Sequence, residues 1–140
     1  MSSWFKLLFV FGLILLGEKT IAQSVDIVYP TTRAVFQRDN NNKGVIPITG
    51  YGDSDITRVE VRLVPISANQ GVLTDWVLLD GSPVAGSFTG VVEGTAGWYV
   101  LQVRTFDANG PNGAAEVSRI GIGEVFIIAG QSNAQGFNFT

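Results

Sequence analysis

Residues 24–122 alternate apolar and polar side chains between turn signals, and no window among them has the apolar period of a helix. The clearest segment is 57–64. Val59, Val61 and Leu63 fall on one face of an extended chain, and Arg58, Glu60 and Arg62 on the other. A strand with one apolar and one polar face lies half buried in an antiparallel sheet. The pattern therefore predicts β-structure throughout this part of the chain.

Six more segments are predicted as strands, namely 25–29, 45–49, 76–79, 86–92, 98–106 and 114–122. Residues that accept positive φ or form Asx turns separate them, at 40–44, 50–53, 80–83, 94–97 and 109–113. About seven short strands in about 100 residues predict an all-β fold, an immunoglobulin-like or fibronectin-like β-sandwich. The chain has no cysteine for a core disulfide, so Trp76 or Trp98 is the expected aromatic anchor.

The first 22 residues have the layout of a secretory signal peptide. A positive start that includes Lys6 precedes an apolar core at 7–16, and a polar tail ends at Ala22. The alternative is a membrane anchor, but residues 17–20 close the apolar run short of the about 20 residues that a spanning helix needs. We predict cleavage after Ala22, no stable membrane insertion afterwards, and a secreted, periplasmic or cell-surface bacterial protein.

Composition limits the partners that the chain can have. Its formal charge is −3 and its nine basic residues are scattered, which argues against a nucleic-acid partner. It contains neither histidine nor cysteine, so neither an imidazole nor a thiolate can hold a metal ion. We expect no cofactor and no metal.

The end of the chain has a different pattern. The apolar run 125–129 leads directly into Gly130, Gln131, Ser132 and Asn133. Such a run is typical of a strand buried on both faces of a parallel α/β sheet, and ligands bind at the carboxyl ends of those strands. A glycine there permits a sharp turn, and a serine after it would be exposed near a helix amino end, where negative charge is stabilised. This is a suitable place for an acyl-transfer nucleophile.

The Gly-Gln-Ser-Asn turn resembles the first sequence block of SGNH-type hydrolases, in the branch of sialate O-acetylesterases and carbohydrate esterases. The resemblance implies that Ser132 is the nucleophile and supplies one backbone oxyanion donor, with Gly130, Gln131 and Asn133 supporting the turn. It implies acetylated carbohydrate or sialic acid as the substrate. The preceding stretch also looks like the amino-terminal sandwich of related exported bacterial proteins, in segments 29–30, 34–38, 58–64 and 97–99.

A serine hydroxyl needs an adjacent general base, and this chain has no histidine. We therefore interpret the 140 residues as a fragment: a signal peptide at 1–22, a β-sandwich at 23–123, and the first strand and turn of a truncated α/β SGNH domain at 124–140. The parent is expected to be an esterase and the fragment inactive. On this interpretation the run 125–129 is either poorly ordered or added to the edge of the sandwich.

The alternative is a non-catalytic immunoglobulin-like surface module for glycan binding or spacing, in which 125–129 is one more sandwich strand.

Other residues also have two interpretations. Arg38 beside Gln37 either holds a sugar or partner domain or, as we expect, is solvated and closes a hairpin. Asp53, Ser54 and Asp55 form a calcium loop or a turn, and we expect the turn. Tyr51, Trp76 and Trp98 form a sugar platform or, as we expect, pack in the core. Asn138, Phe139 and Thr140 match a glycosylation sequon to which we assign no role.

Overall fold

The computed structural model describes residues 24–128, and these form eight strands and no helix. In chain order the strands are β1 (Asp26–Tyr29), β2 (Val35–Gln37), β3 (Lys43–Tyr51), β4 (Arg58–Pro65), β5 (Val77–Asp80), β6 (Ser87–Thr95), β7 (Gly97–Asp107) and β8 (Gly110–Gly123). In this part of the chain no helix is long and apolar enough to cross a membrane.

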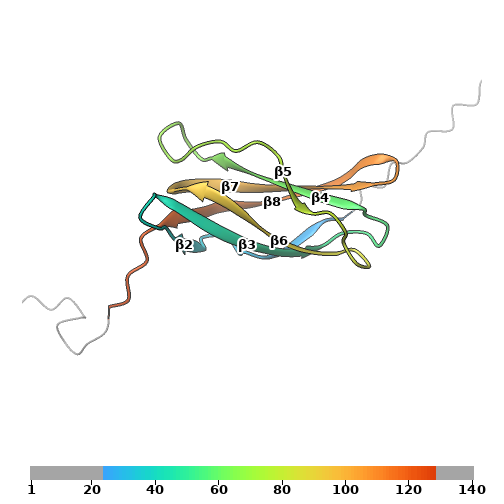
Figure 1. The fold of residues 1–140 in the computed structure, drawn as a ribbon, viewed down its shortest axis with the longest axis horizontal. Coiled ribbons are helices and arrows are strands. Elements are labelled where there is room, and N and C mark those ends of the chain that lie inside the picture. The colour runs from blue at the N-terminus through green and yellow to red at the C-terminus, as the bar shows by residue number, and fades with distance from the viewer. Residues whose placement is uncertain (1–23, 129–140) are drawn as a thin grey trace, which may run out of the picture.

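The strands form two sheets that face each other as a β-sandwich (Figure 1). One sheet has the order β1-β3-β6, and the other has the order β2-β8-β7-β4-β5. All pairs are antiparallel except β2 with β8, which are parallel. The first and the last described residues lie at opposite ends of the long axis of the sandwich (Figure 1). The predicted all-β, two-sheet fold is therefore confirmed.

The core forms where the apolar faces of the two sheets meet. Val59, Val61 and Leu63 of β4 are fully buried, as the alternation predicted. The full buried set is Ile46, Ile48, Ile56, Val59, Val61, Leu63, Leu79, Phe88, Val92, Tyr99, Leu101, Val103, Ile120 and Ile122. Each such aliphatic or aromatic side chain contributes about 1.5–3 kcal/mol when it leaves water. Thr105 is the buried polar residue of this region, and its hydroxyl donates to Asn112 Oδ1 at 2.7 Å.

Close packing at Gly50 leads to a first testable prediction. A Cβ at this position would lie 2.3 Å from the carbonyl oxygen of Asp26 and 2.4 Å from Cζ of Phe88. Gly50→Ala therefore forces β1 and the Phe88 ring apart and should lower the free energy of unfolding by about 1–3 kcal/mol. Urea denaturation measures this loss. Gly123→Ala is the matched control, because no atom lies within 4 Å of its added Cβ. Equal stability of the two variants would contradict the packing argument.

Several predicted boundaries differ from the structure. Lys43 and Gly44 belong to β3, so the first turn ends at Asn42, which has a φ of 63°. β6 extends to Thr95 and β7 begins at Gly97, so one residue joins them instead of a four-residue turn. β8 is longer than predicted, and β2 was not predicted as a strand.

Neither tryptophan is the core anchor that the sequence suggested. Trp98 is 37% exposed, and Trp76 lies on the outer face of the five-stranded sheet between two guanidinium groups. The large buried aromatic residues are Tyr99 and Phe88. The alternation of β7 explains the difference: Trp98 precedes the buried Tyr99, and therefore points to the other side of the sheet.

Candidate functional site

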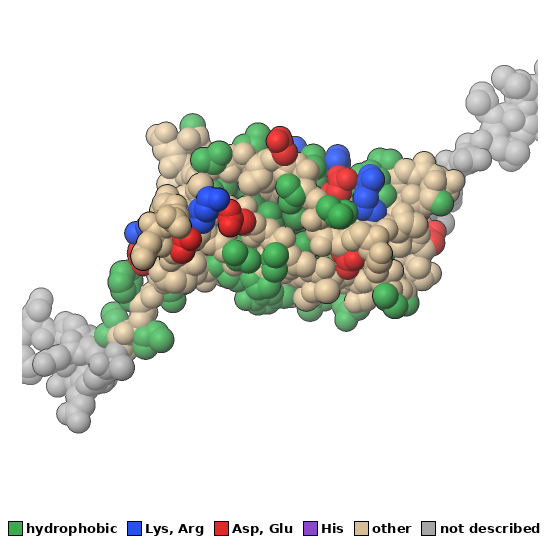
Figure 2. Space-filling model, in the orientation of Figure 1, with side chains coloured by type: hydrophobic (Ala, Val, Ile, Leu, Met, Phe, Trp, Pro, Cys, Tyr) green, Lys and Arg blue, Asp and Glu red, His purple; other side chains and the backbone are tan. Residues whose placement is uncertain are grey.

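The predicted nucleophile turn, Gly130, Gln131, Ser132 and Asn133, lies outside the described residues, as do the predicted signal peptide and sequon. Their roles and the proposed domain boundaries stay predictions. The described part of the apolar run, 125–128, belongs to neither sheet, so it is not a further sandwich strand over these residues. Its side chains are exposed, from 49% at Val125 to 92% at Ile127. The segment extends away from the sandwich (Figures 1 and 2).

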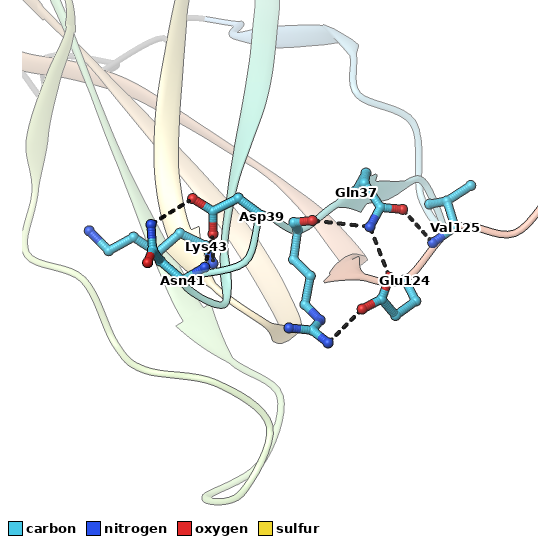
Figure 3. A network of polar contacts seen from close by, with 7 residues as sticks. Gln37, Asp39, Asn41, Lys43, Glu124 and Val125 are labelled. Atoms are coloured by element: carbon cyan, nitrogen blue, oxygen red, sulfur yellow. Dashed lines mark hydrogen bonds and ion pairs between the residues drawn. The ribbon is translucent and has the colours of Figure 1, made fainter.

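A network of polar contacts holds the chain where it leaves β8. We call Gln37, Arg38, Glu124 and Val125 the exit network (Figure 3). Gln37 Oε1 accepts a hydrogen bond from the backbone N–H of Val125 at 2.7 Å, and Gln37 Nε2 donates to Glu124 Oε2 at 2.9 Å. The Arg38 guanidinium pairs with the other Glu124 oxygen, and its backbone N–H donates to Gly123 O at 2.8 Å. These contacts exist because β2 pairs in parallel with the last three residues of β8.

The exit network corrects one interpretation. Arg38 was expected to be a solvated residue that closes a hairpin. Instead it follows the three-residue strand β2, and its guanidinium is paired with Glu124. Its side chain is 34% exposed. Arg38 therefore holds Glu124, the first residue after β8, and its contact with a sugar or a partner domain stays a prediction.

A tight turn built on Asp39 follows the exit network. Asp39 Oδ1 accepts hydrogen bonds from the backbone N–H groups of Asn41 and Lys43, both at 2.8 Å (Figure 3). These bonds, that from Lys43 first, lower the pKa of the Asp39 carboxyl below its ordinary value, because they stabilise the charged form. Lys43 Nζ contacts Glu93 Oε1 at 2.6 Å, and this hydrogen bond raises the pKa of the Lys43 ammonium.

The lowered pKa of Asp39 predicts a loss of stability in acid. A carboxyl whose pKa is lower in the folded state stabilises the fold above its unfolded pKa of 3.8 and loses that contribution as the pH falls through the folded value. At pH 7 the unsubstituted chain should therefore have a higher melting temperature than Asp39→Asn. The difference in melting temperature should disappear as the pH falls below 3.8. Thermal unfolding at a series of pH values measures the difference. A gap that is constant with pH would contradict the prediction.

The three aromatic residues considered as a sugar platform are not assembled into one surface. Tyr51 is on β3 of the three-stranded sheet and is 57% exposed. Trp76 precedes β5 and lines a hollow with Gln102 and Arg104. Trp98 begins β7 and lines another hollow with Arg33 and Arg119. The joint platform is therefore wrong, and so is the expectation that both tryptophans pack in the core.

Trp76 instead belongs to a ladder of stacked rings and guanidinium groups on the outer face of the five-stranded sheet. Arg62 and Arg104 lie over its ring at 4.6 Å and 4.2 Å, and Arg58 lies over the Phe106 ring at 4.0 Å. Glu60 pairs with both Arg58 and Arg104. Alternation places β4 and β7 residues of one parity on this face, so their side chains meet across the strands. The ladder therefore places the Glu60 carboxylate among guanidinium groups on the outer face of the sheet.

The hollow beside Trp98 combines polar and aromatic groups. It has a volume of about 580 Å³, within the range of small-ligand pockets, and is lined by Arg33, Ile66, Ser67, Gln70, Trp98 and Arg119. These residues come from the β1–β2 turn, the β4–β5 loop, β7 and β8. Trp98 can be singled out from the sequence but neither arginine can, because no local pattern joins positions 33, 67 and 119.

The residues considered for calcium form a turn, as expected. The backbone N–H of Ile56 donates to Asp53 O at 3.3 Å, which closes this turn before β4. Within residues 24–128, no three acidic side chains are grouped so that they could hold a metal ion.

Comparisons with known proteins identify no family. No family model matches the sequence, and no curated protein matches it. Among solved structures, a chain from the structures of Clostridium thermocellum CbhA fibronectin(III)-like modules is similar in shape, with a TM-score of 0.43 and 15% sequence identity. The match covers 74% of this chain and 100% of that one. The assignment of a β-sandwich rests on the strand pairing described above.

Proposed function

We propose that residues 23–123 are the non-catalytic amino-terminal sandwich of an exported carbohydrate O-acetylesterase, of the sialate type, and that Ser132 is the nucleophile of the domain that begins after β8. One observation supports this above the others. The exit network directs the exposed apolar residues 125–128 away from the sandwich, and the Gly-Gln-Ser-Asn turn follows within a few residues. An exposed run of this kind is suited to become a strand of a neighbouring domain.

The chemistry assigned to Ser132 is acyl transfer. Its hydroxyl attacks the acetyl carbonyl, the sugar alcohol leaves with a proton, and water releases acetate from the acyl-serine. A general base must take the proton from Ser132, and the 140 residues contain no histidine. The base is therefore proposed to come from further along the parent chain. Neither a metal ion nor an organic cofactor takes part in this mechanism.

A second candidate function is that of a spacer or glycan-binding module on the cell surface. The specific observation in its favour is that the described chain enters and leaves the sandwich at opposite ends (Figure 1). A module with this connectivity can separate two neighbouring domains. The two candidates differ in whether catalysis follows in the same polypeptide.

Acetate release from an acetylated sugar tests the proposed esterase. The first sample is the 140-residue chain, and the second is the product of the parent gene read in frame to its natural stop codon. We expect activity from the second sample alone, because the first contains no imidazole base. An in-frame continuation with an Asp-x-x-His pair is expected in the gene. A stop codon directly after Thr140, or activity in the 140-residue chain, would overturn the proposal.

A further inference from the structure

The hollow beside Trp98 is built from four separate parts of the fold. The backbone N–H of Arg33 donates to Arg119 O at 2.7 Å, which ties the β1–β2 turn to β8. The N–H of Trp98 donates to Gln70 O at 2.9 Å, and Trp98 O accepts from the N–H of Ile66 at 3.0 Å. The β4–β5 loop is thereby tied to β7 on both sides of Ser67. These bonds hold the backbone segments that carry the lining residues next to one another.

The indole of Trp98 packs closely against the backbone of β8 at Gly121. Gly121 lies opposite Trp98 in the β7–β8 pairing, and a Cβ on Gly121 would lie 3.0 Å from Cζ3 of the indole. The absence of a side chain at Gly121 lets the ring lie close to β8. Trp98 is nevertheless 37% exposed, so part of the ring remains open to a ligand. An open indole ring stacks well on the apolar C–H face of a sugar ring.

Two guanidinium groups accompany this ring, whereas no carboxylate lines the hollow. The ladder on the outer sheet face is different, because Arg58 and Arg104 there form ion pairs with Glu60. Among residues 24–128, no ion pair joins Arg33 or Arg119 to an acidic side chain. In a chain of net charge −3, this hollow concentrates positive charge.

Both arginines also have unusual backbone conformations. Arg33 has a φ of 69° and Arg119 a φ of 55°. Both values lie in the left-handed region, which residues other than glycine and asparagine rarely adopt. Arg119 lies where the register between β7 and β8 shifts, and this irregularity turns the chain at the edge of the hollow. Strained conformations of this kind cluster at ligand sites.

From these features we infer that the hollow binds a sugar residue that carries a carboxylate. The Trp98 ring stacks on the sugar, and the guanidinium groups of Arg33 and Arg119 receive the carboxylate through charge-assisted hydrogen bonds. Ser67 and Gln70 provide neutral hydrogen-bonding groups for sugar hydroxyls. A volume of about 580 Å³ accommodates one or two sugar residues.

The position of the hollow connects it with the proposed esterase. Trp98 and Gly97 pair with Gly121 and Ile122, within three residues of Glu124 and the exit network. A glycan anchored here lies at the end of the sandwich from which the chain continues to Ser132. The link to substrate recognition rests on the proposed function, whereas the binding of an acidic sugar does not.

Binding of two matched sugars to the 140-residue chain tests the inference. Methyl β-D-glucuronoside and methyl β-D-glucoside differ only by a carboxylate in place of a hydroxymethyl group. Isothermal titration calorimetry should show about tenfold or more tighter binding of the glucuronoside, since a hydrogen bond to a charged group contributes about that factor. Equal affinities, or no binding of either sugar, would overturn the inference. Sodium sulfate is then added at the same concentration as the glucuronoside. If it displaces the sugar, the hollow is a simple anion site and the sugar assignment is wrong.

Variants of the residues that line the hollow test whether the sugar binds there. Arg33→Asn and Arg119→Asn remove the guanidinium groups but suit a left-handed backbone, and Trp98→Ala removes the ring. Each should weaken glucuronoside binding about tenfold or more. Arg62→Gln and Trp76→Ala are matched controls from the ladder. Their affinity for the glucuronoside should equal that of the unsubstituted chain. Unchanged affinity in all three hollow variants, with melting temperatures that show them folded, would refute the site. Because binding needs no catalytic base, this result is independent of the acetate-release assay.

Discussion

Ser132→Ala is expected to abolish acetyl-ester hydrolysis by the product of the intact gene, with a loss of about 10⁶-fold in kcat. The reason is that the acyl-serine cannot form without the Ser132 hydroxyl, so only oxyanion stabilisation and substrate binding remain. Acetate release from an acetylated sugar gives the rate, and the affinity for unreactive sugar should change little. This is the largest effect that the proposed mechanism predicts.

Ser82→Ala is the control for that experiment. Ser82 lies exposed in the turn after β5, and its replacement should leave the rate unchanged. Ser132→Ala that retains activity would show that another residue is the nucleophile. The resemblance of the Gly-Gln-Ser-Asn turn would then carry no catalytic meaning in this protein.

The largest effect on stability is expected at Tyr99, which is fully buried in the core. Its hydroxyl donates to Thr95 O at 2.7 Å and accepts a hydrogen bond from the N–H of Val72 at 3.1 Å. Tyr99→Ala removes the ring and these bonds, and should lower the free energy of unfolding by about 3–5 kcal/mol. Tyr99→Phe keeps the ring and should lose about 1–3 kcal/mol, because the Val72 N–H and the Thr95 carbonyl lose a partner.

Urea denaturation of both variants separates the ring from the hydroxyl. Tyr51→Phe is the matched control, since Tyr51 is 57% exposed, and its change should be within about 0.5 kcal/mol. Tyr99→Phe should also loosen the β4–β5 loop, which contains Val72 and the hollow residues Ser67 and Gln70. Full stability of Tyr99→Phe would mean that water replaces the hydroxyl without cost, and the loop would then be held by its backbone bonds alone.

The fold was predictable where one face of a strand is buried. Period-two alternation predicted strands at β4 and β7, and for β4 also the buried face, because each inward side chain meets the opposing sheet. β2 could not be recognised, since it has three residues and its partner in β8 lies more than 80 positions away. Only the parallel pairing of these distant segments explains why Arg38 meets Glu124.

The hollow illustrates a second limit of prediction from sequence. Alternation along β7 already placed Trp98 on the face opposite Tyr99, but the size of its side chain suggested a core position. Arg33 and Arg119 carry no local signal, because their approach depends on the β1–β2 turn and the register of β8. The nucleophile turn is the reverse case: it is predicted from four residues that lie outside the described part of the chain.

The first and the last described residues lie at opposite ends of the sandwich, and this has a mechanical consequence. Tension applied to the polypeptide on both sides acts along the strands, and the hydrogen bonds that join β8 to β7 run across that direction. Such bonds are loaded in shear and must break together rather than one after another. A sandwich connected in this way is expected to resist stretching along its long axis.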